Sequence, residues 1–434
     1  MKKLLLFLFI LSLPAFSQQL SKAYILSEGG FSSGTSKLSM LDVVNNNFSD
    51  NIFNPGQIGL YPDGIILYDD HLYLLEQGSF GGSGKIYKTD TTGLVLSSEV
   101  VGTNPYSLAM TNNKIYITNG PAGNVSVLNL NDLSFIKNIA VGVYPQEIIS
   151  LNDKIFVANN SLFGGAADST VSVIDPVLDT VISTIVVKKD PSSLSVSNDG
   201  FLFIGCPGDG DNGKIFKADP STFQLIDTIS LPGFGFGKDL VQDKAGNNLF
   251  FISSINDIVK YNLDNEDISG IIASVFPNNY YYGYNYDYVN KNHYVLDAKD
   301  FTITGTFTIH DSAGTIIDTY STGIAPKKVL LKYNEPSTGV EENFHAANSF
   351  TLEQNYPNPF NPSTKIRWTL PQAGYVTLKV YDVLGSEIAS LMEEERASGI
   401  YETDFDGSGL GSGIYFYKLE AGSFVQIKKM TLIK

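Results

Sequence analysis

Few side chains in this sequence are of the kinds that perform covalent catalysis. The chain has one cysteine and four histidines, namely Cys206, His71, His293, His310 and His345. A nucleophilic serine or cysteine needs a base beside it, and the sequence contains no HExxH or phosphate-loop motif. We therefore expect no catalytic residue and no cofactor. Cys206 follows an apolar stretch, so we expect it to be packed rather than reactive.

The acidic residues offer one candidate metal loop and no candidate catalytic pair. Asp209 and Asp211 are spaced like the start of a calcium loop, but Pro220 stands where the last acidic ligand is required. A tight turn is the better interpretation, and we expect no metal. Carboxylates that hydrolyse glycosidic bonds are brought together only by folding. An extracellular hydrolase or lyase acting on a polysaccharide thus stays open, and acids converging at one rim would favour it.

Aromatic residues in glycine-rich loops are the best candidates for binding. Loops on one rim of a rigid scaffold commonly carry binding residues, and tyrosine combines a flat apolar face with a hydroxyl group. The alternative is that these rings pack beneath their loops or between strands. The candidate ligand-binding residues are Phe31, Phe80, Phe163, Tyr280 and Tyr281.

A repeat of four short strands positions these loops. Its units recur at roughly 45 residues, and a proline opens most of them. Those prolines are Pro62, Pro105, Pro145, Pro191 and Pro326. Within a unit, apolar and polar residues alternate between Gly, Asn and Asp, which predicts a four-stranded antiparallel meander. Such units bury their faces only by stacking around a ring, so the repeat predicts a β-propeller.

The two ends of the repeat predict how the ring closes. The repeat begins within a unit, at Ala23, and ends with a single strand at residues 327–333. That last strand would complete the first unit and remove its exposed edge. We therefore expect an all-β protein with a seven-bladed β-propeller over residues 18–333.

The remaining residues predict a linker and a second domain. Residues 334–349 are polar, contain Pro and Gly, and lose the alternation, as linkers do. Residues 350–434 return to alternating strands that suit a small antiparallel β-sandwich. Within it, residues 387–397 also fit a short helix, although Gly385 and Gly399 closely bracket this segment.

Both parts resemble known families. Residues 114–120, 124–130 and 170–187 resemble the YVTN-type propeller repeat, as in surface propellers of Bacteroidetes-type bacteria. The C-terminal block resembles the type A sorting domain of type IX secretion, which implies that the type IX translocon is a partner. The matching residues are Asn355, Pro357, Asn358, Pro359, Phe360, Asn361, Pro362, Gly385, Gly413, Tyr415, Lys428 and Lys429.

The N-terminus and the net charge agree with export. Lys2 and Lys3 precede an apolar run that ends at Leu13, and small residues surround Ser17. This order predicts a signal peptide over residues 1–17, because the run is shorter than the roughly 20 residues of a transmembrane segment. The net charge of −16 disfavours nucleic acid as a partner. We expect a secreted or outer-membrane surface protein that passes through the periplasm.

These patterns favour a non-catalytic binding or interaction module with an unknown extracellular ligand, which is a glycan, a corrinoid or a protein. The corrinoid is a candidate ligand because this chain resembles surface propellers of Bacteroidetes-type bacteria, some of which bind cobalamin. The polysaccharide hydrolase or lyase is the alternative from another functional class.

Deleting Leu352 to Lys434 should trap the protein in the periplasm while the propeller still folds, because the linker separates two independent cores. Immunoblotting of periplasm and culture medium, with limited proteolysis to check folding, measures this. A truncated protein that reaches the medium, or that is degraded, would contradict it.

Overall fold

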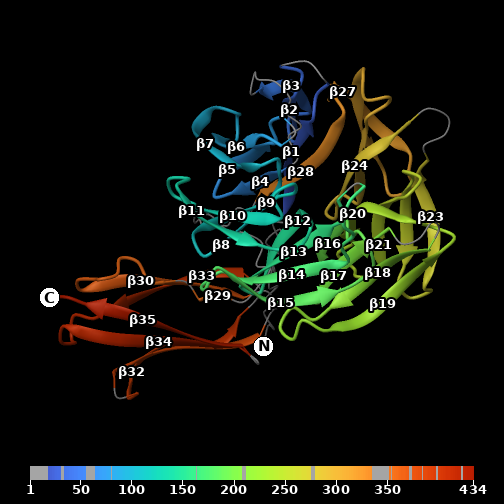
Figure 1. Ribbon diagram of the computed structural model, residues 1–434. Helices are drawn as coiled ribbons and strands as arrows, with labels where there is room; N and C mark the ends of the chain where they lie inside the picture. Colours follow the sequence, from blue (N-terminus) through green and yellow to red (C-terminus); the bar gives the residue numbers. More distant parts are fainter. Residues whose placement is uncertain are drawn as a thin grey trace, which may run out of the picture.

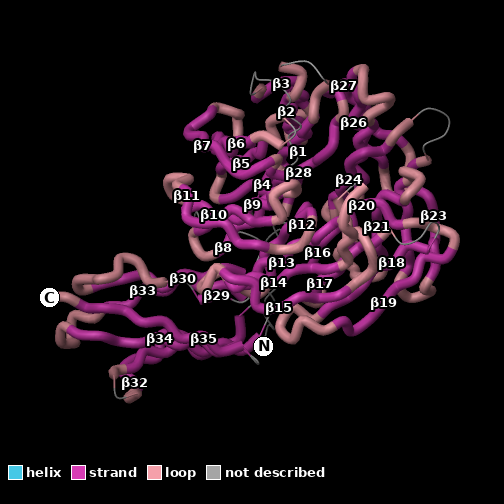
Figure 2. Tube along the Cα trace, in the orientation of Figure 1, coloured by secondary structure: helices cyan, strands magenta, loops and turns pink. Residues whose placement is uncertain are grey.

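The computed structural model consists of strands and turns (Figure 2). It describes residues 18–30, 34–54, 64–79, 81–162, 164–207, 212–274, 279–334, 351–352, 354–370, 374–383, 385–396, 399–421 and 424–434. Across these ranges no helix offers the length and apolarity that a membrane crossing requires. The signal peptide predicted for residues 1–17 lies outside the described residues, and so does nearly all of the predicted linker.

Four-stranded antiparallel sheets follow one another along the chain, and each runs from an inner strand to an outer strand. The first four are β28 (Pro326–Asn334), β1 (Gln19–Ser27), β2 (Lys37–Asp42), β3 (Asn47–Phe53); β4 (Ile65–Tyr68), β5 (His71–Glu76), β6 (Ser83–Asp90), β7 (Val95–Thr103); β8 (Pro105–Thr111), β9 (Lys114–Asn119), β10 (Asn124–Asn129), β11 (Phe135–Ala140); β12 (Tyr144–Leu151), β13 (Lys154–Asn160), β14 (Thr170–Asp175), β15 (Thr180–Val186).

The sheets that complete this part have the same order, so the predicted meander is confirmed throughout. They are β16 (Ser193–Val196), β17 (Leu202–Cys206), β18 (Asn212–Ala218), β19 (Leu225–Pro232); β20 (Phe236–Gln242), β21 (Asn248–Ser253), β22 (Ile258–Asn262), β23 (Asp267–Ala273); β24 (Tyr281–Asp287), β25 (Asn292–Asp297), β26 (Thr304–His310), β27 (Ile316–Ile324).

The sheets stand around a common axis (Figure 1). Each inner strand contacts the inner strand of the next sheet, and the series returns from β24 through β28 to β4. The predicted closure is confirmed, because β28 pairs antiparallel with β1 along nearly its whole length. The fold is thus all-β and propeller-like, and the last strand of the ring shares a sheet with the first strands of the chain.

Strand β1 shows why the sheets need one another. Successive side chains of a strand point to opposite faces. Ile25 of β1 packs in a core with Tyr294 of β25, whereas Tyr24 packs in another core with Leu74 of β5. All four side chains are almost fully buried. A single sheet therefore has two apolar faces, and both are covered only when neighbours stand on either side.

The C-terminal residues form two sheets that project to one side of the ring (Figure 1). One contains β29 (Thr351–Leu352), β30 (Ser363–Leu370) and β33 (Gly399–Asp406). The other contains β32 (Glu387–Arg396), β31 (Gly374–Tyr381), β34 (Gly413–Ala421) and β35 (Phe424–Leu432). Trp368, Val380, Tyr417 and Met430 lie in the single core between them, as expected for the predicted sandwich.

Residues 387–396 form a strand rather than the short helix that their apolar spacing allowed. β32 pairs with β31, and the pairing shifts register twice, leaving Ile388 and Leu391 as extra residues. Each bulge changes which face the following residue takes. Ile388, Ala389, Leu391 and Met392 consequently all reach the core, so a bulged strand produced the spacing of a helix.

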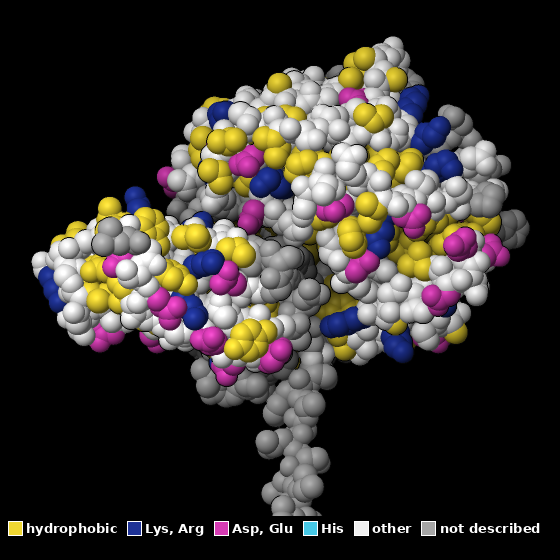
Figure 3. All heavy atoms as spheres, turned by 90° about the horizontal axis from the view of Figure 1, so that it is seen from below, with side chains coloured by type: hydrophobic (Ala, Val, Ile, Leu, Met, Phe, Trp, Pro, Cys, Tyr) yellow, Lys and Arg dark blue, Asp and Glu magenta, His cyan; other side chains and the backbone are white. Residues whose placement is uncertain are grey.

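Charged side chains of both signs are interspersed over the face seen from below (Figure 3). On this face the net charge of −16 thus produces no continuous patch of one sign. Such a surface favours solubility.

A chain ending at Ala325 should fold far less stably than one ending at Asn334, because β28 supplies the inner strand of the first sheet. Its loss would expose the β1 edge and the core around Val329. We expect thermal unfolding of the two chains to show a midpoint difference of more than about 10 °C. Midpoints within a few degrees would contradict the role given to this closure.

Candidate binding site on the inner strands

Polar residues gather near the beginnings of the inner strands, around the axis of the ring. They lie on the rim that carries the turns between second and third strands, which we call the entry rim. Together these residues form the inner cluster: Glu28, Tyr106, Glu147, Lys238, Asp239, Tyr282, Lys327 and Lys328.

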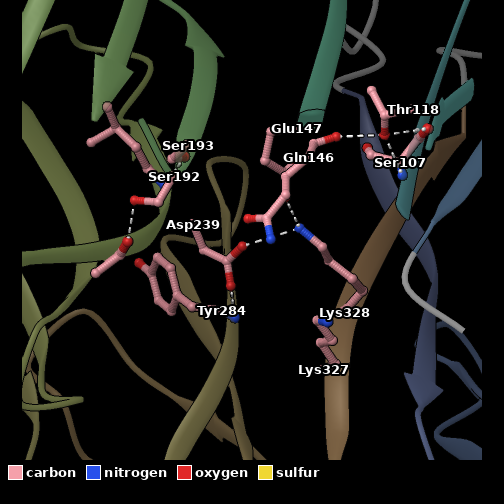
Figure 4. A network of polar contacts seen from close by, with 12 residues as sticks. Ser107, Thr118, Gln146, Glu147, Ser192, Ser193, Asp239, Tyr284, Lys327 and Lys328 are labelled. Atoms are coloured by element: carbon pink, nitrogen blue, oxygen red, sulfur yellow. Dashed lines mark hydrogen bonds and ion pairs between the residues drawn. The ribbon is translucent and has the colours of Figure 1, made fainter. Parts of the chain in front are cut away.

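Lys328 lies between two carboxylates from different sheets (Figure 4). Its Nζ is 2.9 Å from Oε1 of Glu147 on β12 and 3.4 Å from Oδ1 of Asp239 on β20. Burial alone would lower the pKa of Lys328, but these two carboxylates outweigh it and raise that pKa. The ammonium group therefore holds three sheets together electrostatically.

Lys327 reaches a different partner on the other side of β28. Its Nζ donates to Oε1 of Glu28 at 2.8 Å, and the hydroxyl of Tyr282 donates to the same oxygen at 3.1 Å. Burial lowers the pKa of Lys327, although Glu28 opposes that shift. Gly283 permits this close approach, because a Cβ there would lie 2.1 Å from the carbonyl oxygen of Lys327.

Lys238 has no carboxylate of its own. Within the described ranges its ammonium group forms no ion pair, and it lies 3.7 Å from the centroid of the Tyr282 ring. Burial lowers the pKa of Lys238 to about 8; the negative charge of nearby Asp239 opposes this shift, and the positive charge of Lys328 adds to it. A buried cation that forms no ion pair and lies against an aromatic face is poised to bind an anion or a polar oxygen of a ligand.

The backbone at Asp239 is bent to place its side chain. Asp239 has a φ of 54°, and β20 shifts register against β21 on either side of Lys238. Bulges of this kind redirect side chains, and a non-glycine residue in the left-handed region is held there by its surroundings. In this bend, Asp239 Oδ2 accepts a hydrogen bond from the amide of Tyr284 at 3.1 Å.

Further side chains join inner strands to the neighbouring sheets. Thr118 donates to the carbonyl oxygen of Gln146 at 2.6 Å, and Ser192 donates to that of Gly237 at 2.6 Å (Figure 4). Asn285 donates to the carbonyl oxygen of Val329 at 3.0 Å. These hydrogen bonds fix the strands that carry the inner cluster.

The aromatic candidates differ in their placement. Tyr280 is 37 % exposed, and its ring lies 4.9 Å from Phe301 and 6.1 Å from Tyr282. The structure thus brings Tyr280 next to the inner cluster. Tyr281 is 6 % exposed, and its hydroxyl donates to the carbonyl oxygen of Ser274, so its contact with a ligand stays a prediction. Phe31, Phe80 and Phe163 lie outside the described residues.

The residues considered for nucleophilic and metal chemistry take other positions. Cys206 is buried, as predicted, and burial raises the pKa of its thiol to about 12. Asp209 and Asp211 are not among the described residues. In the described ranges, no group of three or more His, Cys, Asp or Glu side chains could hold a metal ion.

Sequence reasoning missed the inner cluster apart from its neighbour Tyr280. The signal was present as charged pairs near the start of inner strands, Lys238–Asp239 and Lys327–Lys328. Glu147 near the start of inner strand β12 is a further charge of this kind, so charged residues at the starts of inner strands mark positions near the axis.

The sorting-motif residues from both ends of the C-terminal domain come together. Asn355 is buried; its amide donates to the Tyr417 hydroxyl at 2.8 Å, and its side chain donates to Thr364 at 3.0 Å. Asn358 accepts from the amide of Thr431 at 2.9 Å. Phe360 exchanges hydrogen bonds with Thr431 and Ile433. The opening motif is therefore fastened to the last strand, which carries Lys428 and Lys429.

The other motif residues surround this contact. The side chains of Pro357, Pro359, Asn361 and Pro362 are exposed, while Phe360 is buried. The remaining motif residues are Gly385, in a turn with a φ of 82°, Gly413 at the start of β34, and Tyr415, whose hydroxyl donates to Gly411. The opening motif and the last strand, which lie far apart in the sequence, are thus joined through Asn358 and Phe360.

Together these features define a class of protein: a propeller-like ring with a polar inner cluster, followed by a secretion-sorting domain. Residues 354–434 match the secretion system C-terminal sorting domain, so the chain is exported by type IX secretion to the cell surface or the extracellular space. Residues 22–295, more than half of the chain, match the model described as a domain of unknown function, DUF5074, and the chain belongs to that family.

Solved structures with the same fold are distant in sequence. A quinonprotein alcohol dehydrogenase-like protein from Bacteroides thetaiotaomicron is 15% identical, with a TM-score of 0.56, over 72% of this chain and 79% of that chain. The periplasmic gluconolactonase of Pseudomonas aeruginosa is 16% identical, with a TM-score of 0.53, over 72% of this chain and 99% of that chain. No curated protein sequence matches this chain. These likenesses support the propeller-like fold alone.

Replacing Lys238 and Lys328 with methionine should change stability in opposite directions. Lys238→Met removes a buried cation and should stabilise the protein near neutral pH by about 1 kcal/mol. Lys328→Met leaves two carboxylates without their cation and should destabilise it by about 2 kcal/mol or more. Chemical denaturation of both variants measures the difference in the free energy of unfolding.

The Lys238 effect should also depend on pH. Because the pKa of Lys238 falls from 10.5 to about 8 on folding, the unfolded chain binds the proton more tightly between these values. The parent therefore gains stability as pH rises from 8 to 10.5, and the advantage of Lys238→Met should shrink over that range. An advantage independent of pH, or a destabilised Lys238→Met variant, would contradict this assignment.

Proposed function

We propose that this protein is a non-catalytic binding module whose ligand is a saccharide held at the inner cluster. In this proposal the four-stranded sheets are the blades of a closed, seven-bladed propeller of the YVTN type. Residues 1–17 are a signal peptide, 18–333 the propeller, 334–349 the linker and 350–434 the sorting domain. The sorting domain engages the type IX translocon.

The observation that carries this proposal is the combination of ring faces and charged hydrogen-bonding groups at one rim. Tyr280 offers a partly exposed ring beside Tyr282 and Phe301. Sugars present apolar faces to such rings and hydroxyl groups to charged donors and acceptors. The side chain of Glu147 remains 18% exposed and that of Lys328 25% exposed, so both are within reach of a ligand.

The carboxylates of the cluster support binding better than hydrolysis. Glycoside hydrolysis uses a carboxyl group that holds a proton together with a second, ionised one. Glu28 and Glu147 each accept from an ammonium group, and Asp239 shares Lys328 with Glu147. Carboxylates that already accept hydrogen bonds from ammonium groups are better placed to orient a ligand's hydroxyl groups than to donate a proton.

A polysaccharide hydrolase or lyase is the second candidate, because Glu147 and Asp239 converge on one Lys328 Nζ from different sheets. This is the arrangement of acids at one rim that the sequence left open. Cleavage of a polysaccharide by the parent, lost in Glu147→Gln, would favour this candidate.

Tyr280→Ala should weaken saccharide binding by about tenfold or more without loss of folding, because an exposed aromatic anchor is removed. Calorimetric titration of the mature protein with a panel of oligosaccharides, and with cyanocobalamin as the corrinoid probe, measures affinity. Phe135→Ala is the matched control, because Phe135 is an exposed aromatic residue on outer strand β11.

Loss of affinity in Tyr280→Ala and Lys238→Met, with Phe135→Ala unchanged, would support the inner cluster as the site. Equal affinity in all three variants would place the ligand elsewhere. Binding of cyanocobalamin but no oligosaccharide would overturn the saccharide assignment in favour of a corrinoid.

A further inference from the structure

The rim opposite the entry rim offers a candidate site between the sheets β20–β23 and β24–β27. A cleft of about 230 Å³ opens there beside the turns that join β20 to β21, β24 to β25 and β26 to β27. Its volume is smaller than the roughly 300 Å³ and more of pockets for drug-sized ligands. A ligand enclosed in this cleft is therefore a small molecule.

Three lysines converge on this cleft from three different segments. Lys244 comes from the β20–β21 turn, Lys260 from β22 and Lys291 from the β24–β25 turn. In the part of the chain that the structure describes, none of the three forms an ion pair with a carboxylate. In a protein with a net charge of −16, this concentration of unpaired cations is local and specific.

Asp243, the one acidic residue that lines the cleft, accepts hydrogen bonds from within its own turn. Asp243 accepts hydrogen bonds from the amides of Asn247 and Asn248 and from the Asn248 side chain, at 3.0, 3.1 and 2.6 Å. Its carboxylate thus fixes the turn that carries Lys244. The lining as a whole is positively charged.

Aromatic rings form the walls of the cleft. The rings of Phe250 and Tyr286 lie 4.7 Å apart at 31°. The ring of Tyr288 stacks on that of Tyr333, with 4.7 Å between the two centroids. The Lys244 ammonium lies 4.6 Å from the centroid of the Tyr288 ring. The Tyr288 hydroxyl also donates to Gln18 at 2.6 Å. These rings are held in place by protein contacts, so the walls are formed before a ligand enters.

His293 lines the same cleft and is almost fully buried. Its Nδ1 and the Tyr284 hydroxyl share a hydrogen bond of 2.8 Å. Burial lowers the pKa of His293 to about 4, and the nearby His310 and Lys260 contribute to that shift. His293 is therefore neutral near neutral pH, mainly because it is buried, and the charge of the neighbouring Lys260 that adds to this shift would attract an anion.

We propose that this cleft binds a small organic anion that carries a planar ring, such as an aromatic carboxylate. The anionic group would lie among Lys244, Lys260 and Lys291, and the ring would rest against Phe250, Tyr286 and Tyr288. Charge-assisted hydrogen bonds supply the first contact and aromatic packing the second. The site is independent of the inner cluster, since it lies on the other rim.

Calorimetric titration of the mature protein with three probes separates these contacts. Benzoate carries both features, acetate only the charge, and benzyl alcohol only the ring. We expect benzoate to bind, and acetate and benzyl alcohol to bind at least about tenfold more weakly. Raising the salt from about 0.1 to 1 M should weaken benzoate binding, because it screens the lysines.

Lys260→Gln and Lys291→Gln should each weaken benzoate binding by about fivefold or more. Lys137→Gln, on outer strand β11, is the matched control and should leave benzoate binding unchanged. All three substitutions keep a long polar side chain and lie outside the apolar cores between the sheets, so each variant should fold. Chemical-shift changes of the His293 imidazole on adding benzoate would locate the probe in this cleft.

The proposal is overturned if benzoate shows no binding at about 10 mM, well beyond the roughly 1 mM dissociation constant of a weak ligand. It is also overturned if acetate binds as tightly as benzoate, because the rings then contribute nothing. Benzoate binding that Lys260→Gln and Lys291→Gln leave unchanged would place the probe elsewhere. Saccharide binding at the inner cluster is measured separately, so either result stands without the other.

Discussion

The pairing of β28 with β1 is the interaction on which the rest of the ring depends. Each sheet has two apolar faces, and a linear row of sheets would leave one face exposed at either end. By hydrogen bonding to β1, the last strand of the ring makes the first sheet complete and lets it pack on both neighbours, as Ile25 and Tyr24 show from opposite faces of one strand. The ring therefore needs this closure for its stability, and the closure joins residues near 25 to residues near 330.

The same pairing assembles the inner cluster. Lys327 and Lys328 reach Glu28, Glu147 and Asp239 only because β28 lies between β24 and β4 around the axis. Burying charges opposes folding, and for Lys238 the burial outweighs the attraction of nearby Asp239, because no carboxylate within the described residues forms an ion pair with it. A protein that needed only a stable ring would gain by replacing such a lysine. Its presence is understandable if the inner strands hold a polar ligand, because function commonly retains groups that stability alone would not.

The two rims and the C-terminal domain divide the surface into parts with different chemistry. The entry rim combines balanced charges with the partly exposed ring of Tyr280, whereas the opposite rim carries lysines without ion pairs beside aromatic side chains. In the sorting domain, the opening motif is fastened to the final strand through Asn358 and Phe360. Removing either end would therefore break this contact between the opening motif and the final strand.

Local patterns were enough to determine the class of fold. Alternation, turn residues and a repeat of roughly 45 residues specify four-stranded meanders, and the single strand left at the end specifies how the ring closes. At residues 387–396 the local spacing fitted both a helix and a strand. Pairing with β31 stabilises the strand, and two bulges explain why its apolar residues have helix-like spacing.

The positions of the residues in the inner cluster and in the opposite cleft depend on the tertiary structure. Lys328 and Glu147 are far apart in the sequence, and so are Lys244 and Ser312 of the opposite cleft. Only the radial packing of sheets sets which inner-strand side chains face one another, so charge pairing and cleft shape are properties of the folded ring.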